Sequence, residues 1–250
     1  MLPIIRSLNA EEKRFVGQTW FARAQREAHL HLRFSSLFQA LRAHQATPTV
    51  VTLAEQTAND CTKHSETYLS IAQEFGVEHA LPEPKRMGPL APTELSISER
   101  IIYELVALSC VQETLTGCLM GQVYQRAKYP RIRLTAHLVF QDEIWHSRLG
   151  WAHLGNVANQ SSVAWLSPLV PSILDLAQTH ELFMPNDPHQ NAPHMNDYGE
   201  LTYEQRIGII KEALQTIVLP GLESMGIDIE GGRSWVIKYS QEHAGHQSQS

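Results

Sequence analysis

The stretch DEIWH at residues 142–146 decides the fold and the candidate site, because it places a Glu and a His three positions apart. On an α-helix, residues at i and i+3 lie on one face, so Glu143 and His146 can reach the same metal ion. One such pair is weak evidence, since about one is expected by chance in a chain of this composition. The weight of the motif therefore depends on the rest of the chain.

A second copy of the pattern occurs earlier, as DCTKH at residues 60–64. Both copies have Asp at the first position and His at the fifth, a combination expected about 0.3 times by chance. Each copy also follows a predicted helix with a Glu that can face inward, Glu27 in the first half and Glu113 in the second. The repeat therefore predicts two similar halves that present acidic and His side chains to one interior point.

Hydrophobic residues at intervals of three and four predict long helices around both copies. These helices are expected over about residues 11–44, 50–75, 93–128 and 131–157. Thr93 is predicted to cap the third helix, and a Pro-rich connection over residues 81–92 is predicted to join two helical hairpins. No useful alternating pattern predicts a strand, so the expected class is all-α.

The last third of the chain predicts accessory helices. One is expected over about residues 161–180, kinked or interrupted at Pro168 and Pro171. Another is expected over about residues 202–225, with a break at Pro220.

The same region also contains two segments without helical pattern. Residues 182–200 are predicted to form a surface loop, and residues 241–250 a frayed tail. We therefore expect one domain over residues 1–250, with a four-helix core over about 11–157 and accessory helices over about 161–240.

Composition excludes several classes of protein. The formal charge is −6 and no basic block stands out, which disfavours nucleic acid as a partner. No apolar stretch approaches the roughly 20 residues of a membrane span, and no signal-type apolar segment begins the chain. The three Cys cannot form a fully paired framework and are expected to be reduced. The expectation is a soluble, cytoplasmic protein.

The predicted metal ligands are Glu27, Cys61, His64, Glu113, Glu143 and His146. A pair of iron or manganese ions needs several carboxylates to neutralise it and imidazoles to complete its coordination, and four facing helices can supply both. Asp60 and Asp142, one residue before the ligand positions, are expected either to orient the His side chains across the bundle or to form ordinary polar surface.

The chain resembles ferritin-like dimetal-carboxylate proteins, in particular bacterial ferritin-like domain proteins. The similar segments are SCVQET at 109–114, residues 142–154 and LPGLESMGI at 219–227, and the likeness extends over about residues 10–240. This resemblance implies a ferritin-like four-helix bundle that binds two iron ions and carries out oxygen chemistry.

Cys61 departs from the family pattern, which has Glu at this position. A thiolate is soft and offers one atom, whereas a bridging carboxylate is hard and offers two. Three outcomes are open: Cys61 binds a different or softer metal, Asp60 or His31 substitutes for the missing Glu, or one half-site is empty. His31 lies one turn after Glu27 on the same face and is otherwise an ordinary polar or packed residue. We expect Cys61 to lie near the metal.

The leading functional hypothesis is an O₂-using oxidoreductase that acts on a small organic substrate and receives electrons from an unidentified donor. Iron is the expected cofactor as two ions, with one ion, manganese or another transition metal as alternatives because of Cys61. The other hypotheses are a ferroxidase or iron-handling protein, and a degenerate scaffold without metal. A homodimer is one assembly open to the chain, and the sequence identifies neither the substrate nor a catalytic residue.

Overall fold

The computed structural model describes residues 7–85, 88–178 and 192–244, and it is all-helical over these ranges. Its elements are α1 (Ala10–Ala43), α2 (Pro48–Glu74), α3 (Ile97–Leu105), the π-helix η1 (Val106–Glu113), α4 (Thr114–Arg126), α5 (Pro130–Ala158), the 3₁₀-helix η2 (Ala164–Leu169), α6 (Val170–Gln178), the 3₁₀-helix η4 (Pro193–Tyr198), α7 (Tyr203–Ala213), the π-helix η5 (Leu214–Val218), α8 (Leu219–Ser224) and α9 (Glu230–Ala244). Within these ranges there is no strand, so the prediction of an all-α protein is confirmed.

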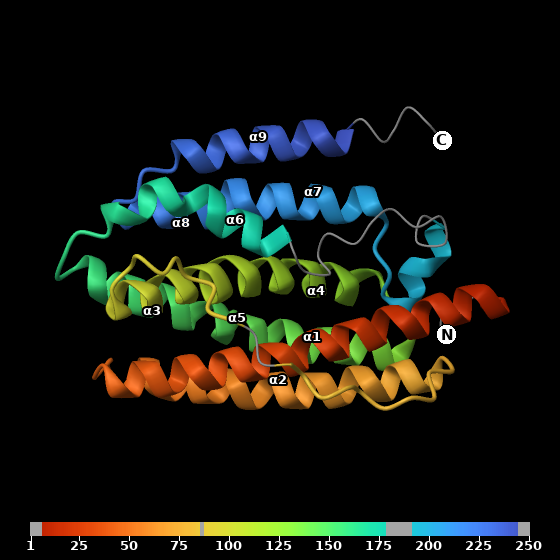
Figure 1. Ribbon diagram of the computed structural model, residues 1–250. Coiled ribbons are helices and arrows are strands. Elements are labelled where there is room, and N and C mark those ends of the chain that lie inside the picture. The colour runs from red at the N-terminus through yellow and green to blue at the C-terminus, as the bar shows by residue number, and fades with distance from the viewer. Residues whose placement is uncertain (1–6, 86–87, 179–191, 245–250) are drawn as a thin grey trace.

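Four long helical rods form the core of the molecule. Figure 1 shows α1 and α2 side by side along one edge, where they pack closely as a hairpin. α5 packs against α2 on one side and against the continuous rod of α3, η1 and α4 on the other, and α3 returns to contact α1. The accessory helices cover the side away from α1 and α2: α6 packs on η1, α7 on α4, and α9 forms the outermost layer (Figure 1).

The helices begin where side chains can satisfy the free backbone N–H groups of the first turn. Asn9 caps α1, with its Oδ1 accepting from the backbone N of Glu12 at 2.9 Å. The predicted cap at Thr93 is wrong: α3 begins four residues later, with Ser96 as its cap and Glu99 completing the reciprocal pair. The Ser96 and Glu99 pair satisfies two donors at once, which Thr93 followed by Glu94 cannot do.

The predicted helix over residues 161–180 is interrupted, as expected, near its prolines. A 3₁₀ segment that contains Pro168 leads into α6, and the final residues of the predicted range lie outside the described ranges. The break predicted at Pro220 is wrong, because α7, η5 and α8 follow one another without interruption. The π-helix η5 lies directly before Pro220 and alters the hydrogen-bonding pattern at the point where a proline removes a helical N–H.

Two further expectations for the C-terminal region need correction. The described part of the predicted surface loop is not all surface: η4 lies within it, and the side chains of Met195 and Glu200 have no exposed area. The remainder, residues 182–191, lies outside the described residues. Residues 241–244, predicted as part of a frayed tail, belong to α9, and residues 245–250 lie outside the described ranges.

Two apolar clusters divide the bundle interior, and a polar layer lies between them. On α1, Ala24 belongs to the larger cluster and Leu30 to the smaller one. On α5, Val139 belongs to the larger cluster and Leu149 to the smaller one. Between the two clusters lie Glu27 on α1 and the residues Glu143 and His146 on α5. Charged groups are thus buried in a layer closed on both sides by hydrocarbon.

Close helix packing near this layer depends on Gly150 of α5. A Cβ atom at this position would lie 2.6 Å from Cβ of Ser109 and 2.7 Å from Sγ of Cys110, both in η1. Real Cβ contacts are not this short, so only Gly lets α5 approach the π-helix this closely. The approach brings the two helices of the second half together beside the polar layer.

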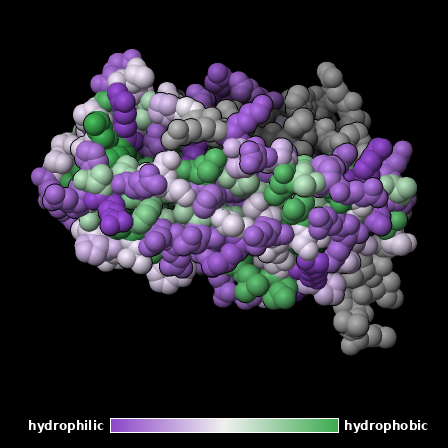
Figure 2. Space-filling view, turned by 60° about the horizontal axis from the view of Figure 1, so that its bottom comes forward, coloured by the Kyte–Doolittle hydropathy of each residue, from purple (hydrophilic) through white to green (hydrophobic). Residues whose placement is uncertain are grey.

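The outer surface contrasts with this interior. Figure 2 shows a face of the molecule that is largely hydrophilic, with small separate hydrophobic patches. Within the described ranges, no helix combines the length and apolar character required to cross a lipid bilayer.

Candidate metal centre

Five of the predicted ligands converge in the polar layer as two overlapping groups. Glu27, His64 and Glu143 form one group, in which a ligand atom of each residue lies within 4.8 Å of those of the other two. Glu113, Glu143 and His146 form the second group by the same measure. Glu143 belongs to both groups, so it lies where a carboxylate could bridge two ions.

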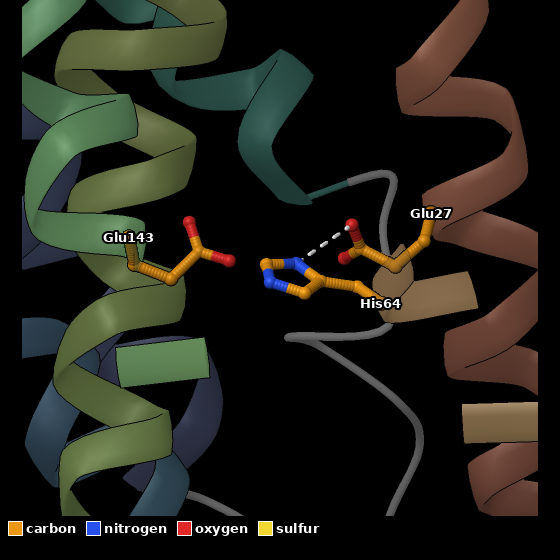
Figure 3. Close-up of side chains that lie close together, drawn as sticks. All are labelled: Glu27, His64 and Glu143. Carbon is orange, nitrogen blue, oxygen red and sulfur yellow. Dashed lines mark ion pairs between the residues drawn. The ribbon is translucent and has the colours of Figure 1, made fainter. Parts of the chain in front are cut away.

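These side chains come from four different rods. Figure 3 shows Glu143 reaching in from α5, Glu27 from α1 on the opposite side, and the His64 ring from α2 between the two carboxylates. None of the five ligand side chains belongs to a residue more than 5% exposed. Gly117 of α4 provides room for Glu143, because a Cβ there would lie 3.2 Å from the Cβ of Glu143. The site is therefore enclosed by the bundle.

Each His is held from its outer nitrogen by an Asp of the other half of the bundle. His64 Nε2 lies 3.0 Å from Oδ2 of Asp142, and His146 Nε2 lies 3.4 Å from Oδ2 of Asp60. This crossed pairing is the arrangement expected for groups that orient metal-binding imidazoles. It leaves the Nδ1 atom of each ring directed at the carboxylates.

The inner atoms of the site lack hydrogen-bond partners. Nδ1 of His64 lies 3.6 Å from Oε2 of Glu27, and Nδ1 of His146 lies 3.3 Å from Oε2 of Glu143, but neither contact has hydrogen-bond geometry. Six of the buried atoms without a hydrogen-bond partner belong to the five ligand residues: Glu27 Oε1, His64 Nδ1, Glu113 Oε1, both Oε atoms of Glu143 and His146 Nδ1. Buried polar atoms are normally paired, so this concentration of free donor atoms indicates a place for a cation.

Without a metal ion, the negative charges of the buried carboxylates are balanced by protons on neighbouring side chains. Burial alone would lower the pKa of His64, but the hydrogen bond to Asp142 and the nearby Glu27 raise it to about 10. Burial likewise opposes protonation of His146, yet Glu143 and Asp60 raise its pKa to about 10. Burial and the charge of Glu143 raise the pKa of Glu113 well above its usual range. Protons therefore neutralise the cluster, and a bound cation would have to release them.

The π-helix η1 carries Glu113 at its last residue, and all eight of its residues are buried. A π turn adds a residue to the helical cycle and rotates the residues after it, and such turns occur often at functional sites. The rotation gives Glu113 its position opposite Glu143. Sequence periodicity predicts a plain helix here and misses this feature.

Two predicted site residues lie outside the groups. Neither group includes Cys61, which is buried among apolar residues of the smaller cluster, including Leu30 and Phe34. Burial raises the pKa of the Cys61 thiol well above its usual value, and Glu27, Glu113 and Glu143 add to the shift, so the thiol adjoins the centre without belonging to either group. His31 points away from the ligands, because its Nδ1 contacts the backbone O of Ala58 at 2.8 Å. The proposed substitution of His31 for a ligand is therefore not supported.

No family model, curated protein or solved structure matches this chain. The interpretation of the centre therefore rests on the chemistry and positions of its own residues.

Two residues that sequence reasoning missed adjoin the centre. The Arg26 guanidinium lies 3.7 Å from Oε1 of Glu27 and donates to Thr116 Oγ1 at 2.8 Å. Tyr68 is fully buried one turn beyond His64, with ring centroids 6.3 Å apart. Helical spacing places Tyr68 on the His64 face and could have identified it, whereas Arg26 is next to a ligand in the sequence and shows no separate signal.

Proposed function

We propose that this chain is a metal-binding protein of the ferritin-like dimetal-carboxylate type, and that it uses iron and O₂ to oxidise a small organic substrate. One observation carries the proposal: enclosed carboxylate oxygens and imidazole nitrogens face one another with no hydrogen-bond partner. Burying such atoms unpaired costs free energy, and a metal ion would offset that cost.

The donor set favours iron or manganese among the transition metals. Carboxylates and imidazoles together suit these ions, and softer metals are selected by thiolates. Since neither ligand group contains Cys61, the reason for expecting a softer metal is weakened. When bound, iron would supply the one-electron and O₂ chemistry that side chains cannot perform.

The chain's own residues have distinct roles in this proposal. Asp142 and Asp60 hold the two imidazoles with Nδ1 directed inward. The two apolar clusters exclude water above and below the ligands, which strengthens electrostatic interactions inside. Glu113 can hold a proton beside Glu143, because burial favours its neutral form. Substrate, O₂ and an electron donor are the partners that the reaction requires.

The test is anaerobic loading of metal-free protein with Fe²⁺, followed by elemental analysis and exposure to O₂. We expect wild-type protein to retain iron and Glu143→Gln to lose most of it, because the substituted side chain would offer a neutral amide to both ligand groups. Glu200→Gln is the matched control, since Glu200 is equally buried but lies outside both groups. Wild-type protein that retains no iron would contradict the proposal.

Oxygen uptake separates this function from iron handling. We expect uptake to stop once the bound iron is oxidised and to resume with a reductant and an oxidisable substrate. Uptake that continues with each further addition of Fe²⁺ would support a ferroxidase instead.

A further inference from the structure

The two ligand groups are unequal in charge, and Arg26 contributes to the difference. Its side chain is only 9% exposed, and its Nη1 lies 3.7 Å from Oε1 of Glu27. Its Nη2 donates to Thr116 Oγ1 at 2.8 Å, and with the amide of Gln112 turned toward it, the amide oxygen accepts from the same Nη2 at 2.9 Å. These bonds fix a permanent positive charge beside the Glu27 group.

The first half of the bundle also contributes one ligand carboxylate fewer than the second half. In the repeat, Cys61 occupies the position that corresponds to Glu143, so α2 supplies His64 alone to the centre. The second half supplies Glu113, Glu143 and His146, which form a complete group by themselves. The Glu27 and His64 pair becomes a group of three only by sharing Glu143.

The formal charges match one divalent ion better than two. Within the two ligand groups, Glu27, Glu113 and Glu143 carry three negative charges when ionised, and Arg26 beside them carries one positive charge, which leaves two negative charges for bound metal. Of the two Asp residues behind the imidazoles, Asp60 is paired with Lys63 at 2.8 Å, and the side chain of Asp142 is 39% exposed, so that water screens its charge. Unlike charges in a buried site attract strongly and like charges repel strongly, because little water screens them. A second divalent ion would leave the centre with excess positive charge.

We infer that the centre binds two divalent ions in a fixed order, and that the group of Glu113, Glu143 and His146 binds the first ion tightly. Arg26 and Cys61 keep the affinity for a second ion, at Glu27 and His64, low. The inference rests on the proposed metal site and specifies its order of filling. The second ion must share Glu143 with the first, and it is repelled by both the first ion and Arg26.

Mn²⁺ titration of the metal-free protein tests the order, with the electron paramagnetic resonance signal of unbound Mn²⁺ as the readout. We expect one ion to bind at least about 100-fold more tightly than a second. His146→Ala should abolish the tight phase, whereas His64→Ala should retain it. His146→Gln, together with the far-ultraviolet circular dichroism of each variant, guards against loss of binding through misfolding.

Two substitutions should strengthen the binding of the second ion. Cys61→Glu adds the missing carboxylate and Arg26→Gln removes the competing cation, and we expect each to lower the second dissociation constant by about tenfold or more. Arg33→Gln is the control for the second substitution, because Arg33 is on the same helix but contacts the backbone O of Gly88 and no ligand.

The outcomes separate the two proposals. Two ions of equal affinity, or a tight phase that survives His146→Ala and is lost in His64→Ala, would overturn the order of filling and leave the metal centre standing. A wild-type protein that binds neither Mn²⁺ nor Fe²⁺ would overturn both.

Discussion

Two of the places where the bundle buries carboxylates neutralise them by different means. Glu200, between η4 and α7, has no exposed area, and its Oε1 lies 3.4 Å from Nη1 of Arg23. Arg206 adds a second guanidinium charge that favours its ionised form. In the candidate metal centre, by contrast, Glu113 and Glu143 face imidazoles and each other.

The difference shows how a structural ion pair can be told from a ligand cluster. A guanidinium is always charged and cannot bind metal, so the cation needed beside Glu200 is supplied by the chain itself. An imidazole can lose its proton, and its free Nδ1 is then a metal ligand; because the pKa of His64 and of His146 is raised to about 10, here a metal ion would have to displace the proton. The charge of Glu200 is therefore neutralised by cations of the chain, although its Oε2 has no hydrogen-bond partner, whereas the candidate centre is balanced by protons that a metal ion could replace.

Removal of a carboxylate should affect the two clusters unequally. Glu200→Ala would leave the buried guanidinium group of Arg206 and the partly buried one of Arg23 without their carboxylate, and we expect the free energy of unfolding to fall by about 3 kcal/mol. Glu113→Gln in metal-free protein replaces a carboxyl whose burial favours the neutral form, and the change should stay within about 1 kcal/mol. Urea denaturation at neutral pH, followed by circular dichroism, measures both. Equal losses of unfolding free energy in the two variants would show that the two clusters do not differ in this way.

The sequence predicted which acidic and His side chains converge in the candidate centre, because these residues follow the helical repeat. Glu143 and His146 share a face through their spacing alone, and the second copy of the pattern located His64. Glu27 and Glu113 followed from their places on the preceding helices. The long helices were predicted for the same reason, since their apolar faces recur at fixed intervals.

The remaining features depend on contacts between distant segments, which periodicity does not report. The π turn before Glu113 is coupled to the close approach of Gly150, which is far away in the sequence. Glu200 stands in a polar stretch that reads as surface, and its burial requires Arg23 from the first helix. Cys61 was expected near the metal; it lies outside both ligand groups and packs in the smaller apolar cluster, yet close enough to the centre for Glu27, Glu113 and Glu143 to raise the pKa of its thiol.

The crossed Asp–His pairs provide a finer test of the comparison, because only the metal centre depends on them. Asp142→Asn should weaken the orientation of His64, and Asp60→Asn that of His146, with a loss of about 10- to 100-fold in metal affinity. Asp197→Asn is the control, since Asp197 is also buried but pairs with Lys128. Competition with a chelator of known affinity measures the change, and unchanged affinity in both variants would show that the pairs do not serve the centre.

The pH dependence of stability gives the smallest expected effect, and it concerns Glu200. Burial raises the pKa of Glu200 above its ordinary value of 4.5, although Arg23 and Arg206 oppose the shift. A raised pKa in the folded state means that the folded protein binds the proton more tightly than the unfolded chain. This contribution to stability is fully present below pH 4.5 and is lost as pH rises through the folded-state pKa. Glu200→Gln cannot titrate, so the free energy of unfolding of wild type relative to this variant should decrease as pH rises across that window. Urea denaturation of both proteins between acid and neutral pH measures the difference, and an increase with pH would show that the guanidinium groups outweigh burial and depress the pKa instead.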